Sequence, residues 1–207
     1  MYGARVSLRI ALFVVLLNGI LGTAIGATAG YVRKLDNPIM RIMDSLMAFP
    51  AILVAITLAA TLGASETNVV LALTVAYAPR TARIVRASVL VIREMEYVQA
   101  AIATGAGYVR VLFHHILLNS MAPLIVQLTF IFAVSVLAEA VLSFIGVGPP
   151  PPTPPWGNII AEGRNYVREA PWISLFPGIA IAVTVLGLNL LGDGLRDVLD
   201  PRMRVGA

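Results

Sequence analysis

Long stretches without a charged residue alternate along this chain with short segments that carry most of its charges. A helix rises about 1.5 Å per residue, so roughly 20 apolar residues are needed to cross about 30 Å of hydrocarbon. Three uncharged stretches meet that length: residues 10–32, 45–65 and 170–192. A fourth covers 116–138, with Glu139 near its far end. The pattern predicts several membrane-spanning helices.

A fifth span is less evident, because its apolar stretch is short and leads into Arg80, Arg83 and Arg86. These arginines recur every third residue and share one helical face, where long side chains can reach the membrane surface or line a protein interface. We therefore predict a helix over 69–92, with a kink at Pro79. The five spans predicted within a single domain, 1–207, are 8–32, 45–64, 68–92, 116–141 and 172–192.

Composition agrees with an all-α integral membrane protein. Hydrophobic residues make up 58% of the chain and charged residues 13%, with a mean hydropathy of +0.87, outside the range of soluble domains. The chain has no cysteine, which leaves neither disulfides nor thiolate metal sites. The net charge of +4 does not indicate nucleic-acid binding, because the positions of the positive residues follow the predicted membrane sides instead.

The distribution of positive charge predicts the orientation in the membrane. Loops on the cytoplasmic side carry an excess of lysine and arginine. One side of the predicted bundle holds 11 of the 15 basic residues, namely Arg33, Lys34, Arg41, Arg80, Arg83, Arg86, Arg93, Arg110, Arg196, Arg202 and Arg204. That side is therefore expected in the cytoplasm together with the loop 93–119 and the C-terminus. The loop 146–171 is expected outside, and its proline-rich part, Gly146–Gly157, is predicted to be extended and stiff.

Enzymatic chemistry finds little support in the sequence. Asp193 in LGDGLRD suggests an intramembrane aspartyl protease, but no second membrane aspartate is present to share the acid and base roles. His114 and His115 are adjacent, so on a helix they point about 100° apart and do not ligate one metal ion without distortion. The chain also lacks a P-loop lysine, so we predict no cofactor here and any ATP hydrolysis on another chain.

The loop 93–119 has the pattern of a helix, a glycine and a second helix. Apolar residues form one stripe before Gly105 (Met95, Val98, Ile102) and another after it (Tyr108, Leu112, Ile116). Small residues cluster at the turn, where bulky ones would hold a partner away. Two interpretations follow: a compact knob that fits a groove in another protein, or an amphipathic helix on the lipid surface.

Two motifs carry a resemblance to a known family. Two alanines, a glycine four residues on, and HIL-x-N resemble the EAA loop of ABC importer permeases, the element that docks onto the cytosolic ATPase. The segments LSFIGVGPPPPTPPWG and PWISLFPGIAIAVTVLGLNLLGDGLRDVLDPR resemble the second permease subunit of dipeptide, oligopeptide and nickel importers. The resemblance implies a type I permease bundle in a bacterial or archaeal cell membrane. It also implies as partners a homologous permease, two ATPases that bind ATP and Mg²⁺, and an extracytoplasmic binding protein.

The resemblance implies functional residues as well. The coupling surface is expected to hold Gln99, Ala100, Ala101, Gly105, Arg110 and His114, while Glu139, Asn189 and Asp193 are candidates for the pathway or its gate. Because a carboxylate within a span is costly in lipid, Glu139 is expected to face protein, water or a partner, or else the headgroups.

Some features depart from the family. Gln99 replaces the leading glutamate, Leu118 replaces a proline, and the chain begins where members usually have passed a first transmembrane helix. Peptides are the expected substrate; nickel or another small solute is the alternative. A secondary transporter, which works without an ATPase, is a further alternative.

Overall fold

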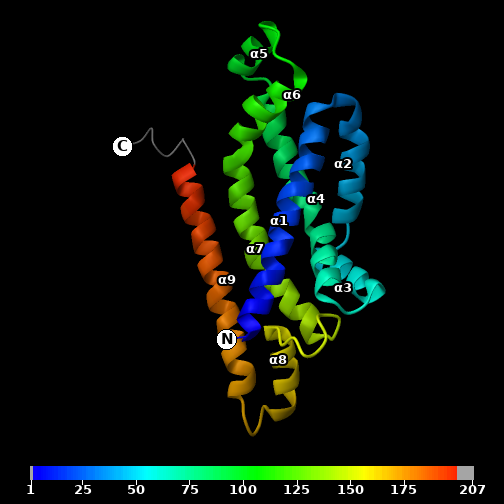
Figure 1. Cartoon of the computed structure of the whole chain (residues 1–207), viewed down its shortest axis with the longest axis vertical. Helices are drawn as coiled ribbons and strands as arrows, with labels where there is room; N and C mark the ends of the chain where they lie inside the picture. The colour runs from blue at the N-terminus through cyan, green and yellow to red at the C-terminus, as the bar shows by residue number, and fades with distance from the viewer. Residues whose placement is uncertain (1, 200–207) are drawn as a thin grey trace.

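The computed structural model describes residues 2–199, and every described regular element is a helix. The helices are α1 (Tyr2–Tyr31), α2 (Arg33–Met47), α3 (Ala51–Leu62), α4 (Glu66–Ile92), α5 (Glu96–Ala103), α6 (Tyr108–Arg110), α7 (Met121–Phe144), α8 (Trp156–Gly163) and α9 (Trp172–Leu199). They form an elongated bundle with α5 and α6 at one end and α8 at the other (Figure 1). The chain stays helical from Tyr108 to Phe144, because a π-helical turn and a 3₁₀ turn join α6 to α7.

Three helical stretches are long and apolar enough to cross a membrane: α1, the stretch from Tyr108 to Phe144, and α9. The 27-residue α4 is also continuous, but its arginines exclude it from that set. The predicted span 45–64 needs correction, because it is not one straight helix. The chain ends α2 at Met47, bends by 87° and starts the 12-residue α3 at Ala51. Pro50 stands at the break, where its missing N–H and fixed φ favour a new helix start.

A seam of glycines joins α1 to α4 at the centre of the bundle. Gly22, Gly26 and Gly30 lie one turn apart on α1 and face α4. A Cβ added to Gly22 would lie 2.5 Å from the Thr81 Cβ, and one on Gly30 would lie 2.8 Å from the Val89 Cβ. These distances are too short for real atoms, so only glycine lets the two backbones approach this closely, as in other packed membrane helices.

Polar contacts join the same two helices at other levels along their length. Near the end that holds the N-terminus, Arg9 of α1 makes a two-pronged ion pair with Glu66 of α4, at 2.8 and 2.6 Å. Deeper in the bundle the buried Asn18 amide donates to the Thr74 carbonyl at 3.4 Å, and the Thr81 hydroxyl donates to the Asn18 Oδ1 at 3.3 Å. Such interhelical bonds satisfy polar groups that lipid cannot.

The segment between α7 and α9 is partly helical, and the predicted non-helical stretch Gly146–Gly157 ends two residues early. The proline-rich part ends at Pro155, and α8 begins at Trp156. The Trp156 backbone N–H donates to the Ser7 hydroxyl at 3.2 Å and so fixes α8 against the first turns of α1. Beyond α8 the chain returns through α9, which runs along α7 (Figure 1). Only 6% of the most apolar window of α9 is buried in this chain.

Candidate functional site at the coupling end of the bundle

Gly105 turns the chain at the tip of the loop between α4 and α7. It has a φ of +88°, and its N–H bonds to the Ile102 carbonyl while the Ala106 N–H bonds to the Ala101 carbonyl, both at 3.0 Å. This pair of bonds is the Schellman arrangement, which ends a helix with a left-handed residue and favours glycine there. A Cβ on Gly105 would meet nothing within 4 Å in the described part of the chain. Gly105 therefore serves the reversal of the chain rather than a close contact within it.

The helix α5 is held to the bundle by a narrower apolar contact than its sequence predicts. Val98 is fully buried and packs in a cluster with Val89 and Ile116. Met95 and Ile102, predicted on the same stripe, are 42% and 47% exposed. The second predicted stripe divides in the same way, since Ile116 is buried, Leu112 is half-buried and Tyr108 is exposed. The outer face of this end consequently presents large apolar side chains, namely Met95, Tyr97, Ile102, Tyr108, Val109 and Phe113.

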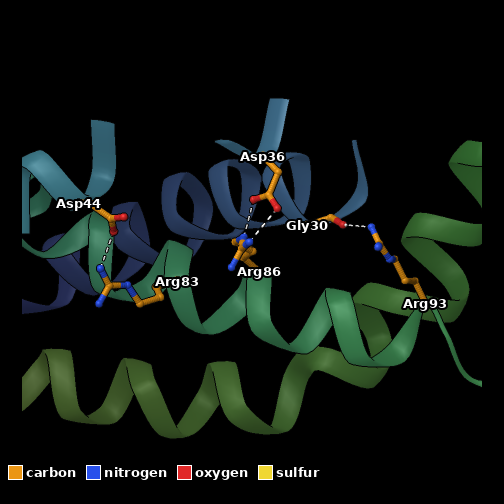
Figure 2. A network of polar contacts seen from close by, with 6 residues as sticks. All are labelled: Gly30, Asp36, Asp44, Arg83, Arg86 and Arg93. Atoms are coloured by element: carbon orange, nitrogen blue, oxygen red, sulfur yellow. Dashed lines mark hydrogen bonds and ion pairs between the residues drawn. The ribbon is translucent and has the colours of Figure 1, made fainter. Parts of the chain in front are cut away.

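The Gln99 side chain is turned back toward its own loop. Its Nε2 donates to the Arg93 carbonyl at 2.8 Å. The Arg93 guanidinium in turn donates to the Gly30 carbonyl at 2.7 Å (Figure 2). A glutamate in place of Gln99 would have no proton to donate to that carbonyl when ionised. The amide therefore links α5 through Arg93 to the end of α1.

The other predicted coupling residues gather at the same end of the bundle. Ala100 is exposed and Ala101 half-buried on α5, while Arg110 and His114 are exposed on the helical stretch that follows the turn. The His114 and His115 rings meet edge to face, with centroids 5.3 Å apart. Within residues 2–199 no group of three or more histidine, aspartate or glutamate side chains is arranged to hold one metal ion.

Two ion pairs that the sequence did not reveal hold α2 against α4. Arg83 contacts the Asp44 Oδ1 at 2.5 Å, and Arg86 binds both oxygens of Asp36, at 2.5 and 2.7 Å (Figure 2). Bidentate pairing of this kind fixes geometry as well as charge. The signal in the sequence was two aspartates about two turns apart on one segment and two arginines one turn apart on another. Only their three-dimensional register shows that the two sets meet.

The three pathway candidates do not form one site. Glu139 of α7 is fully buried; it accepts from the Ser143 hydroxyl at 2.6 Å, and its other oxygen has no hydrogen bond within the described residues. Asn189 and Asp193 are exposed on α9. They line a groove between α7 and α9 with Gln127 and Arg196. The expectation that Glu139 faces protein holds, whereas its separation from the other two argues against a shared role.

Comparisons with known proteins agree with this architecture. Residues 20–205 match the family model described as binding-protein-dependent transport system inner membrane component. The chain is 58% identical over 205 residues to a putative peptide transport system permease protein of Brucella suis biovar 1 (strain 1330), covering 99% of this chain and 69% of the relative. It is 46% identical over 204 residues to the dipeptide transport system permease protein of Alkalihalophilus pseudofirmus, covering 98% and 67%.

A solved structure shows the same fold. The inward-facing methionine ABC transporter superposes with a TM-score of 0.78 at 18% identity, over 96% of this chain and 94% of that one. The family match covers most of the chain, and the helical arrangement is that of an importer permease. The chain therefore belongs to the binding-protein-dependent transport system inner membrane components, as the multi-pass permease subunit of an ABC importer.

Proposed function

We propose that this permease carries di- or oligopeptides across the membrane. The observation that carries the proposal is the identity of 58% and 46% to relatives named as peptide and dipeptide permeases, over nearly the whole chain. The chain spans about two thirds of the length of those relatives, so the activity of the complete importer stays part of the proposal. Nickel and other small solutes are the competing substrates.

We further propose that the end formed by α5 and α6 docks onto a cytosolic ATPase. Ile102, Tyr108 and Val109 are exposed there beside the turn at Gly105. Apolar side chains of this size on an outer end favour a protein partner over water. The ATPase would bind ATP and Mg²⁺ and move α5, and α5 would transmit that movement to the spans through α4.

The remaining partners follow from the same importer class. A homologous permease would complete the pathway, and an extracytoplasmic binding protein would deliver substrate to the end that holds α8. We take α2 and α3 together as one broken crossing and α4 as another. With the arginine-rich side in the cytoplasm, α5 and the C-terminus would then lie there. Arg202 and Arg204, which contribute to the charge argument, lie outside the described residues.

Uptake of labelled dialanine by the complete importer, reconstituted in proteoliposomes with its binding protein, tests the substrate. We expect the vesicles to accumulate dialanine only when ATP is present on the side of the membrane that holds the ATPases. Excess unlabelled dipeptide should suppress this accumulation. The same vesicles should not accumulate Ni²⁺. Accumulation of Ni²⁺ without dialanine would refute the peptide assignment and leave the importer class intact.

A matched pair of glycine substitutions tests the coupling role of the turn. Gly105→Ala forces a side chain into a left-handed conformation that costs about 1–2 kcal/mol. Gly107→Ala adds the same atom at an ordinary φ of −68°, also with nothing within 4 Å of it among the described residues. We expect the Gly105 variant to lose dialanine uptake and ATPase association severalfold and the Gly107 variant to keep both. Equal behaviour of the two variants would contradict this role.

A further inference from the structure

Three arginines lie on one face of α4, and two of them are paired with carboxylates among the described residues. Arg83 pairs with Asp44 and Arg86 with Asp36, both from α2. Arg80, one turn further from the coupling end, has no carboxylate within ion-pair distance among residues 2–199. The reason is geometric: α2 ends at Met47 and the chain bends by 87°, so the acidic face of α2 stops short of Arg80.

Arg80 sits near the middle of α4. It is 14 residues from Glu66 and 12 from Ile92, which corresponds to about 21 Å and 18 Å along a helix. The Arg80 side chain is exposed on the surface of this chain, so its guanidinium is open to a partner, to water or to a passing solute. An unpaired charge in a span faces the interior of a bundle or a water-filled path, and such residues mark substrate pathways.

A pocket at the bend between α2 and α3 receives Arg80. Its volume is about 310 Å³, within the range of small-molecule sites. Met47, Phe49 and Pro50 from the bend line it, and Ala76 of α4 contributes beside Arg80. Arg80 is the single charged side chain among the described residues that line it. The pocket thus combines uncharged side chains with one cation that has no ion-pair partner among residues 2–199.

We propose that Arg80 binds the C-terminal carboxylate of the peptide during its passage through the permease. This inference rests on the proposed peptide substrate and assigns a contact within it. A guanidinium matches a carboxylate in shape and charge and binds it through two parallel hydrogen bonds. Every transported peptide with a free C-terminus carries that group, whatever its side chains, so one arginine serves a broad range of sequences. The other side chains that line the pocket are uncharged, so they offer no ionic contact to the side chains of the peptide.

The test combines a change in the residue with a change in the substrate. The variants are Arg80→Gln and, as the matched control, Arg83→Gln one turn away. The substrates are dialanine and its C-terminal amide, each presented by binding protein whose loading is confirmed by fluorescence. Assembly of each variant with its partners is checked by gel filtration before uptake is measured.

We expect Arg80→Gln to slow dialanine uptake by about tenfold or more, the effect of losing a charge-assisted contact, and to leave uptake of the amide at the wild-type rate. Arg83→Gln should change the two substrates by the same factor. If Arg80→Gln slows both substrates equally, its effect does not depend on the C-terminal carboxylate and the proposal is wrong. An unchanged rate for dialanine also overturns it.

Chemical modification of a cysteine at position 80 tests the charge after the importer has assembled, so a defect in assembly does not affect the result. The chain contains no cysteine, so Arg80→Cys places a single thiol in this subunit. After assembly, a methanethiosulfonate reagent with a trimethylammonium group should restore dialanine uptake, and one with a sulfonate should not. Equal effects of the two reagents would refute the need for a cation. If the wild-type importer takes up no peptide at all, the proposed function is refuted. If it transports peptide and the Arg80 variants do so at the same rate, only the proposed role of Arg80 is refuted.

Discussion

At the scale of single residues, the buried carboxyl of Glu139 illustrates what a membrane protein must satisfy internally. One oxygen accepts from Ser143, and both residues are on α7, one turn apart. The cost of a carboxylate in lipid predicted that Glu139 would face protein, water or a partner, or else the headgroups, and its side chain is buried within this chain. The hydrogen-bond donor to Glu139 was not predictable in the same way, because any hydroxyl, backbone N–H or donor on a neighbouring helix could have satisfied the carboxyl.

Removal of that partner should destabilise the protein. Ser143→Ala removes the hydrogen bond that the buried Glu139 carboxyl accepts from its own helix, a loss of about 1–3 kcal/mol in the free energy of unfolding. Ser45→Ala is the control, because the Ser45 hydroxyl is exposed and bonds only the Arg41 carbonyl in its own helix; it should stay within about 0.5 kcal/mol. Denaturant unfolding of the purified chain in detergent measures both. A loss in the control as large as in Ser143→Ala would contradict the role of the bond.

At the scale of helices, the sequence predicted the apolar elements better than their interruptions. The long uncharged stretches were sufficient to predict α1, α7 and α9. Proline gave an ambiguous signal, since Pro50 marks a break while α4 continues through Pro79. The difference lies in packing: Thr74 and Thr81, on either side of Pro79, both bond Asn18 of α1, whereas Pro50 is exposed. Tertiary contacts that no single stretch of sequence shows therefore decide where a helix ends.

The seam between α1 and α4 gives a prediction at this scale. Gly26→Leu inserts a side chain against the Ala82 carbonyl and the Val85 Cβ, so α1 must separate from α4. We expect a loss of about 3 kcal/mol or more in the free energy of unfolding, as in strongly overpacked cores. Gly187→Leu on α9, where an added Cβ meets nothing within 4 Å in this chain, should be neutral or slightly stabilising, because leucine favours helix. Thermal unfolding in detergent compares them, and similar midpoints would argue against the seam.

At the scale of the whole molecule, the two loops with proposed roles lie at opposite ends of the bundle (Figure 1). The loop with α5 is expected in the cytoplasm from the distribution of arginines, and α8 on the other side. The helices between these ends could be placed from the sequence only as separate stretches. Their mutual arrangement depends on contacts such as Arg86 with Asp36, which join segments 50 residues apart.

Labelling of single cysteines tests this orientation. Thr104 and Arg168 are both exposed and lie near opposite ends, and the chain has no cysteine of its own. A membrane-impermeant maleimide should label Arg168→Cys in intact cells and Thr104→Cys only after permeabilisation. Full labelling of both variants in permeabilised cells is the control. Labelling of Thr104→Cys in intact cells would reverse the proposed topology.

The close approach of α1 to α4 also has a genetic consequence. Every change at the first or second base of a glycine codon adds at least a Cβ or ends the chain. At positions 22, 26 and 30 that one carbon already meets the backbone or Cβ atoms of α4. At position 19 it meets only the end of the Leu128 side chain, at 3.3 Å, and that flexible side chain can move away slightly. In α1 we therefore expect substitutions at positions 22, 26 and 30 not to be tolerated, whereas alanine at position 19 should be tolerated.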